Sequence, residues 1–355
     1  MVNAEGAVNL PWLAPTLQSV LSTQRSHALL VQGPRGVGQF DLAIALAQGW
    51  LCEATDPSRQ RPCGACASCK LVQAHVHPDM LVLLPEALRE PLGWAGGGSD
   101  EEGEGAASTG PSDKAGKRKP SKDIRIDEVR QAVTFAQTTS ARGLGKVVVL
   151  HPVERMNMAS SNALLKTLEE PAGNSRLVLS TSAPDLLLPT IRSRCQIVPV
   201  GLPDASVSAA WLTAQGVAQA EVLLAATGGQ PQEALLWANE GISAALWSGL
   251  PKQLARGDVG TLSAWPLPRL IDMLQKLCHD LQRRSVGATP RYFALSALVP
   301  SAPMAALNTW VVELQAQVRH AEHPWNAGLM AEALVAQARV ALTVASRTTK
   351  SVSVH

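Results

Sequence analysis

The sequence predicts an α/β core with a parallel sheet, followed by a small helical domain and a C-terminal all-α domain. Three observations predict this fold: apolar runs rich in Val and Leu alternate with helical patterns, a glycine loop joins the first run to a helix, and the strand signal ends past Pro203. Buried parallel strands are continuous apolar runs, and alternating strands and helices are typical of an open α/β sheet. The predicted strands are 28–32, 80–84, 147–151, 177–180 and 196–200, and the predicted helices between them are 39–51, 126–138 and 158–170.

The domain boundaries follow from the places where these patterns change. The α/β core covers residues 1–201, and residues 202–250 read as short helices rich in Ala and Leu, with a break at Gly228-Gly229. Residues 251–355 contain longer amphipathic patterns, which indicate a separate helical domain. The longer helices predicted there are 266–283 and 303–319.

The segment 93–123 interrupts the core with a different composition. It is rich in Gly, Ser, Asp, Glu and Lys and has almost no apolar residues after Trp94. Such a segment buries too little apolar surface to offset the entropy of ordering it. We therefore expect a disordered insertion within the core.

Length and composition narrow the class of protein. The chain has 355 residues, 46% of them apolar and 17% charged, which suits a globular protein of two or three domains. A net charge of +2 is too small to indicate a nucleic-acid surface. No apolar run is long enough to span a bilayer, and residues 1–15 lack the basic start and apolar core of a signal peptide. We expect a cytoplasmic protein without a membrane partner.

The glycine loop has the frame of a nucleotide-binding loop but lacks its reactive residues. An apolar strand runs into Gly33, Gly36 and Gly38, in the spacing of the phosphate-binding motif G-x-x-x-x-G-K-[ST]. Gln39 stands where the motif has the lysine that reaches the phosphates, and Phe40 stands where it has the hydroxyl that holds Mg²⁺. Gln carries no charge and Phe cannot ligate a metal, so the loop is degenerate.

The second motif of a nucleotide-hydrolysing core is also missing. The strand 146–150 ends in His151-Pro152, where a hydrolase has an acidic pair that supports Mg²⁺ and polarises water. His is a poor Mg²⁺ ligand, Pro has no acid–base group, and Glu154 lies too far along the chain to assume the same role. We expect no ATP hydrolysis by this chain. Weak nucleotide binding stays open because the backbone N–H groups of the loop remain.

Four of the six cysteines form the cluster C-x10-C-x2-C-x2-C. Two-residue gaps let neighbouring thiolates converge on one tetrahedral ion, and four sulfurs without an open position indicate a structural zinc site. An iron–sulfur cluster and four unligated thiols are the alternatives. His75 and His77 lie nearby in sequence, and we interpret them as surface residues or as residues that support the ligands. The four candidate ligands are Cys52, Cys63, Cys66 and Cys69.

Several motifs together resemble the delta-prime family of bacterial DNA polymerase III clamp-loader subunits, which belongs to the AAA+ class. The resemblance covers nearly the whole chain. The cysteine cluster is shared with the ATPase subunits of the same assembly (gamma/tau), whereas the degenerate loop and the missing acidic pair favour delta-prime. The motifs that carry the resemblance are Leu10–Leu13, Ser26–Leu30, Ile126–Arg130, Asn157-Met158, Ser161–Pro171 and Thr190–Cys195.

The resemblance implies a role for Arg194 as an arginine finger, which acts on ATP bound by a neighbouring subunit. From the residues alone, Arg194 reads as a surface or salt-bridged arginine. An arginine suits the finger role because its guanidinium is always charged and bridges two phosphate oxygens. Ser193 and Cys195 are then expected to fix the turn rather than to take part in chemistry. Gln232 stands where the family's ATPases carry an arginine that senses their own nucleotide.

The resemblance also implies the setting in which the chain acts. It implies a lid at 202–250, a helical collar domain at 251–355, and a non-hydrolysing place in a heteropentamer with gamma/tau ATPase subunits and the delta subunit. That assembly loads the sliding clamp onto primed DNA within the DNA polymerase III holoenzyme. Two alternatives stay open: an active ATPase subunit of the same loader, and a free-standing zinc-binding adaptor built on an inactive NTPase core.

Overall fold

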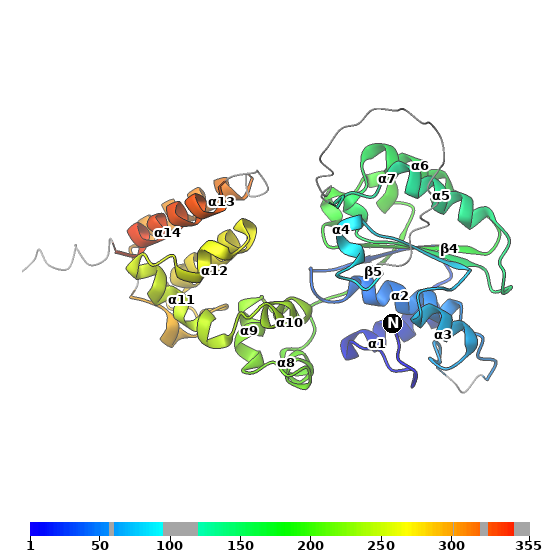
Figure 1. Cartoon of the computed structure of the whole chain (residues 1–355), viewed down its shortest axis with the longest axis horizontal. Helices are drawn as coiled ribbons and strands as arrows, with labels where there is room; N and C mark the ends of the chain where they lie inside the picture. The colour runs from blue at the N-terminus through cyan, green and yellow to red at the C-terminus, as the bar shows by residue number, and fades with distance from the viewer. Residues whose placement is uncertain (57–59, 95–119, 301, 320–325, 344–355) are drawn as a thin grey trace, which may run out of the picture. The chain divides into compact units, whose positions relative to one another are not determined.

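The computed structural model describes residues 1–56, 60–94, 120–300, 302–319 and 326–343. The chain divides into two compact units, Met1–Pro203 and Asp204–His355, each treated separately below (Figure 1). Most of the insertion predicted to be disordered, 93–123, lies outside the described residues. Among these residues, no helix combines the length and the apolar character needed to cross a membrane.

The first unit is built on a five-stranded sheet in the order β2-β3-β4-β1-β5, and every pair of neighbouring strands is parallel. This confirms the predicted fold class. All residues of β3 are buried, and so is most of β1, which is why these strands read as continuous apolar runs. The strands are β1 (Ala28–Gln32), β2 (Met80–Leu83), β3 (Lys146–Leu150), β4 (Ser175–Thr181) and β5 (Gln196–Pro199).

Helices cover both faces of this sheet (Figure 1). On one face, α5 and α6 bury Val129 and Leu164 against strand residues such as Leu30 and Val148. The helix α2 packs on the other face, with α1 against it. The helices of this unit are α1 (Ala14–Thr23), α2 (Gln39–Trp50), α3 (Ala67–Gln73), α4 (Glu86–Arg89), α5 (Ile126–Gln137), α6 (Met158–Glu169) and α7 (Pro189–Arg192), with short 3₁₀ turns at Pro11–Leu13, Val153–Arg155 and Pro184–Leu186.

The second unit is helical throughout its described residues. Gly228 and Gly229 adopt positive φ values of 73° and 90° and separate α9 from α10, as the sequence predicts. Trp237, Trp247 and Trp310 are fully buried in its core. Its helices are α8 (Ala205–Ala214), α9 (Ala220–Ala226), α10 (Pro231–Asn239), α11 (Ala244–Arg256), α12 (Leu267–Ser285), α13 (Met304–Val318) and α14 (Ala327–Thr343), with 3₁₀ turns at Gly260–Ala264 and Leu295–Ala297.

The predicted boundary between lid and collar, after residue 250, falls inside α11. One apolar cluster contains buried side chains from α9 to α14, on both sides of this boundary. The division of the second unit into two domains therefore stays a prediction, as does the exact end of the core at residue 201.

Candidate functional site

The glycine loop forms between β1 and α2, as its spacing predicts. Gly36 and Gly38 have φ values of 73° and 96°, in the left-handed region that favours glycine, and Gly38 is the N-cap of α2. A Cβ on Gly33 would lie 2.1 Å from the carbonyl oxygen of Val200, so only glycine fits there. The backbone frame of a phosphate-binding loop is therefore intact.

Gln39 closes this loop on itself. Its side chain is 5% exposed, and Nε2 donates hydrogen bonds to the carbonyl oxygens of Gly33 and Pro34, at 2.6 and 2.5 Å. The amide is thus engaged with the loop's own backbone. The position that supplies a positive charge in a working loop here holds a neutral group with its donors already used.

Phe40 begins an aromatic cluster made of Phe40, His75, Trp94 and His151. The Phe40 ring is buried and lies 5.1 Å, centroid to centroid, from His151 and 6.2 Å from Trp94, edge to face. Trp94 in turn stacks on His75 with centroids 3.9 Å apart. Phe40 stands at the position of the hydroxyl that holds Mg²⁺ in a hydrolase, and His151 stands at the position of the acidic pair. Packed rings therefore occupy both positions.

His151 is held neutral within this cluster. Burial lowers its pKa to about 4, although the charge of Glu154 acts in the opposite direction. Nδ1 of His151 lies 2.9 Å from the hydroxyl of Ser180. Oε1 of Glu154 accepts hydrogen bonds from the backbone N–H and the hydroxyl of Ser182, at 3.1 and 3.0 Å. The strand end thus carries a neutral ring, and the nearby carboxylate is bonded to a serine.

Arg194 follows α7 and is held at the surface by an ion pair. Its side chain is 33% exposed, and Nε donates to Oε1 of Glu169, the last residue of α6, at 2.5 Å. Nη1 donates to the carbonyl oxygen of Thr190 at 2.9 Å and to the hydroxyl of Ser193 at 3.4 Å. Cys195 is buried, and burial raises the pKa of its thiol to about 12. The motifs Ser161–Pro171 and Thr190–Cys195 are therefore in contact through the guanidinium of Arg194.

The four clustered cysteines come together. Their sulfur atoms all lie within 4.8 Å of one another, and those of Cys52 and Cys66 are 4.0 Å apart. Sulfurs bound to a tetrahedral zinc at about 2.3 Å lie roughly 3.8 Å apart, so the spacing fits such an ion. The backbone N–H groups of Cys63, Cys66 and Cys69 each point at a cluster sulfur, at 3.4 Å.

The electrostatics of the cluster favour a thiolate at one position at least. Burial disfavours the charged form of Cys63, but the N–H groups of Cys66 and Ala65 outweigh it and lower the pKa of this thiol to about 6. A set of four sulfurs, one of them readily ionised, suits a soft divalent ion. An iron–sulfur cluster uses the same ligand set and stays an alternative.

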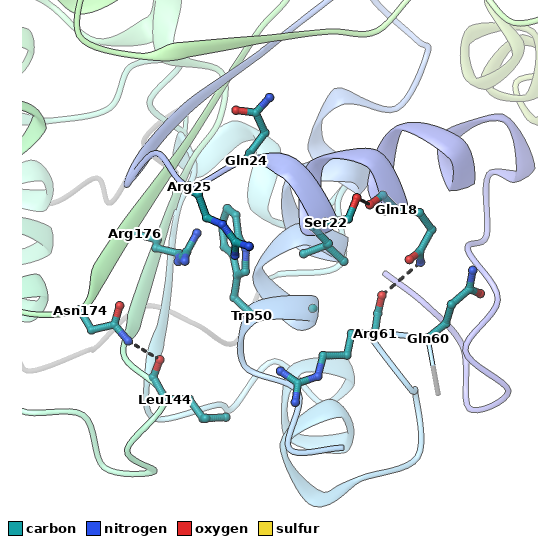
Figure 2. A pocket seen from close by; sticks show the side chains of 12 residues that line it. Gln18, Ser22, Gln24, Arg25, Trp50, Gln60, Arg61, Leu144, Asn174 and Arg176 are labelled. Atoms are coloured by element: carbon teal, nitrogen blue, oxygen red, sulfur yellow. Dashed lines mark hydrogen bonds between the residues drawn. The ribbon is translucent and has the colours of Figure 1, made fainter. Parts of the chain in front are cut away.

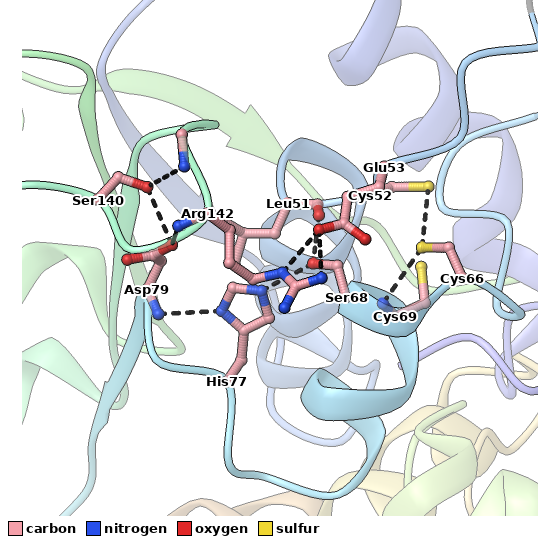
Figure 3. A network of polar contacts seen from close by, with 11 residues as sticks. Leu51, Cys52, Glu53, Cys66, Ser68, Cys69, His77, Asp79, Ser140 and Arg142 are labelled. Atoms are coloured by element: carbon pink, nitrogen blue, oxygen red, sulfur yellow. Dashed lines mark hydrogen bonds and ion pairs between the residues drawn. The ribbon is translucent and has the colours of Figure 1, made fainter.

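A hydrogen-bonded network beside the cysteines was not predicted from the sequence (Figure 3). The N–H of Asp79 donates to Nδ1 of His77 at 3.0 Å, which leaves the proton on Nε2. Nε2 lies 2.7 Å from the hydroxyl of Ser68, which donates to the carbonyl oxygen of Leu51. His77 therefore supports the helix turn between two cysteines, in agreement with one of the two roles expected for it.

The carboxylate of Asp79 anchors this network to the loop before β3. It is fully buried and accepts hydrogen bonds from the N–H groups of Ala141 and Arg142, at 2.7 and 2.8 Å, and from the hydroxyl of Ser140 at 2.9 Å. Burial disfavours its charge, but these donors and the ammonium of Lys146 outweigh burial and lower its pKa. The network fixes the cysteine module to the sheet edge.

Neither the aromatic cluster nor this network could be predicted from a motif in the sequence. Trp94 is the last large apolar residue before the polar insertion, which is the one signal that it packs inward. Gln232 lies in the first turn of α10, in the second unit, so its place beside the loop stays a prediction.

The first unit has a parallel sheet with a glycine loop between β1 and α2, and a helical unit follows it. This arrangement defines an AAA+-type P-loop protein. The family model described as "DNA polymerase III, delta subunit" matches residues 12–202. DNA polymerase III subunit delta' of Pseudomonas aeruginosa is 31% identical over 88% of this chain and 92% of its own length. The Escherichia coli protein of the same name is 29% identical over 78% of this chain and 77% of its own.

A second kind of relative matches over a shorter range. DNA polymerase III subunit tau of Escherichia coli is 30% identical over 48% of this chain and 20% of its own length. The delta' proteins of Pseudomonas aeruginosa and Escherichia coli match over much more of the chain. The chain therefore belongs to the delta' family of DNA polymerase III clamp-loader subunits.

Proposed function

We propose that this chain is a clamp-loader subunit that hydrolyses no ATP itself and that supplies Arg194 to ATP bound by a neighbouring subunit. The absence of ATP hydrolysis by this chain is proposed on one observation, the pair of hydrogen bonds from Gln39 to the carbonyl oxygens of its own loop. A γ-phosphate at this loop meets neither a lysine nor a Mg²⁺ ligand. The aromatic cluster and the neutral His151 support the same conclusion.

The second half is supported by the environment of Arg194. A finger must be charged, accessible and held in a defined direction before it meets the phosphate. Arg194 is partly exposed, and Glu169 and Thr190 fix two different nitrogens of its guanidinium. In the adjacent site it neutralises charge that develops on the transferred phosphoryl group, an effect of about 10³–10⁵ in rate in other systems.

The partners follow from the family. We propose an assembly with gamma/tau-type ATPase subunits and a delta-type subunit, which together place a sliding clamp on primed DNA. In this assembly we propose that the chain is a rigid end piece, because a loop without the lysine and the Mg²⁺ ligands does not pass through a cycle of ATP hydrolysis. The setting is the DNA polymerase III holoenzyme.

The test is reconstitution. Purified chain is mixed with the ATPase and delta-type subunits, and complex formation, ATP turnover and clamp loading are measured with and without it. We expect a stable complex whose turnover on primed DNA rises when the chain is added. Failure to enter any complex would favour a free-standing adaptor instead.

We further propose a structural zinc ion on Cys52, Cys63, Cys66 and Cys69. The sulfur spacing and the N–H groups that point at the sulfurs support it. Elemental analysis of the purified chain is expected to give about one zinc per chain, and a chelator is expected to lower the unfolding temperature. Iron with a visible absorption band would favour the iron–sulfur alternative, and the absence of both metals would overturn the proposal.

A further inference from the structure

A pocket of about 550 Å³ lies at the end of the sheet away from the glycine loop. Figure 2 shows the side chains that line it. Arg25 precedes β1, Asn174 and Arg176 flank the start of β4, and Leu144 precedes β3. These are the amino ends of parallel strands, whereas the glycine loop follows the carboxyl end of β1. The pocket is therefore separate from the nucleotide loop. Arg194 also precedes the amino end of a strand, β5, but it is not one of the residues that line the pocket.

The pocket is positively charged. Of the residues that the structure describes, three arginines line it and no acidic residue does. Arg61 uses one nitrogen to donate to the carbonyl oxygen of Ala54 at 2.6 Å.

Arg176 is the most unusual residue of the pocket. Its guanidinium lies over the ring of Trp50, 4.7 Å from the centroid, which fixes its direction. Its Nη1 is buried and has no hydrogen-bond partner among the described residues. Burial lowers the pKa of Arg176, and the nearby charge of Arg25 lowers it further. Two like charges beside a buried, unused donor are unfavourable unless an anion joins them.

We propose that this pocket binds a phosphate group. Guanidinium groups match phosphate oxygens in geometry and charge, and such hydrogen bonds are among the strong ones. The half-buried guanidinium of Arg176 supplies one cation to the pocket, and the exposed Arg25 supplies a second beside it. The volume also leaves space for more than a single phosphate, which suits pyrophosphate or the phosphorylated end of a larger ligand.

Titration calorimetry on the full chain tests this, with inorganic phosphate, pyrophosphate, and a short oligonucleotide with a 5′-phosphate or a 5′-hydroxyl as probes. The chloride concentration is held constant. Binding of the small anions marks a free phosphate compound as the source, whereas binding of the 5′-phosphorylated oligonucleotide alone marks a nucleic-acid end. If no probe binds, the proposal is wrong.

Variants locate the binding. Arg25→Ala and Arg176→Ala are each expected to weaken it by about tenfold or more, the loss of one charge-assisted hydrogen bond. Arg130→Ala, an exposed arginine of the same unit paired with Asp127, is the matched control and is expected to change nothing. Arg25 is exposed, so its variant tests the pocket even if Arg176→Ala disturbs folding. Binding that survives both pocket variants would place the anion elsewhere, for example on the glycine loop, and would overturn the proposal.

Discussion

The glycine loop and the turn at Ser193–Cys195 differ in whether their polar side chains are buried or accessible. In the loop, Gln39 bonds to its own backbone and Phe40 packs into an aromatic cluster. In the turn, Arg194 keeps its charge and stays partly exposed, although Glu169 pairs with it. The backbone frame of the first region survives while its chemistry is replaced by packing. Under the proposed function, this comparison means that a nucleotide-binding fold has lost its own site and presents a charged group to the site of a neighbouring subunit.

The largest expected effect comes from removing the exposed guanidinium. Arg194→Ala in a reconstituted loader is expected to lower ATP turnover at the site it faces by about 10³-fold, because the transition-state charge loses its partner. Arg192→Ala is the matched control, since Arg192 is a neighbouring exposed arginine paired with Asp185. Single-turnover hydrolysis is the measurement. If the two substitutions lowered turnover equally, Arg194 would have no special role, and the contrast between the glycine loop and this turn would be wrong.

The aromatic cluster gives the next effect, on stability. Phe40→Ala is expected to lower the free energy of unfolding by about 3 kcal/mol, because it removes a buried ring and leaves a cavity beside Trp94 and His151. Leu186→Ala, at an exposed apolar residue of the same unit, is the control and is expected to have little effect. Urea unfolding measures both. An unchanged stability for Phe40→Ala would mean that the loop is not closed by packing.

His151 should make stability depend on pH. The folded residue protonates near pH 4 and an unfolded histidine near pH 6.5, so the unfolded chain binds the extra proton between these values. The contribution of neutral His151 is full above about pH 6.5 and is lost as the pH falls toward 4, by up to about 3 kcal/mol.

His151→Phe tests this dependence, because it keeps a ring beside Phe40 and removes the titrating group. Unfolding free energies of both proteins are compared from pH 7 down to the lowest pH at which both fold reversibly. The variant is expected to lose less stability than the wild type over this window. Parallel curves for the two proteins would show that His151 is not held neutral, which would mean that the charge of Glu154 offsets the effect of burial.

The smallest effect concerns the pair that positions Arg194. Glu169→Gln is expected to change the free energy of unfolding by less than about 1 kcal/mol, since an ion pair this exposed is screened by water. Turnover in the loader should fall less than with Arg194→Ala, because the guanidinium is still present. Asp127→Asn, which breaks the exposed pair with Arg130, is the control. A loss as large as that of Arg194→Ala would make Glu169 essential for the function of the finger.

The sequence predicted the fold well because buried parallel strands have a simple signature. The predicted strand 147–151 corresponds to β3 at Lys146–Leu150, and the predicted helix 158–170 corresponds to α6 at Met158–Glu169. It also predicted the cysteine cluster, since two-residue gaps bring the thiols of Cys63, Cys66 and Cys69 together locally. Cys52 is separated from Cys63 by ten residues, and its sulfur reaches the other three because of how the chain folds.

Contacts between distant segments could not be predicted in the same way. The stacking of Trp94 on His75, the use of Gln39's donors inside the loop, and the pairing of Arg194 with Glu169 all depend on which segments the fold brings together. The three arginines that line the pocket lie far apart in sequence and form no basic stripe. Their shared surroundings appear only once the amino ends of β1 and β4 are placed side by side.

The most direct test of the central claim is ATP binding and hydrolysis by the purified chain alone, with and without primed DNA. We predict no turnover above background and weak or absent binding, because Gln39, Phe40 and His151 offer neither a charge nor a metal ligand to the nucleotide. Turnover that is abolished by substituting Gln39 or His151 would contradict the account, since these residues would then form a working site.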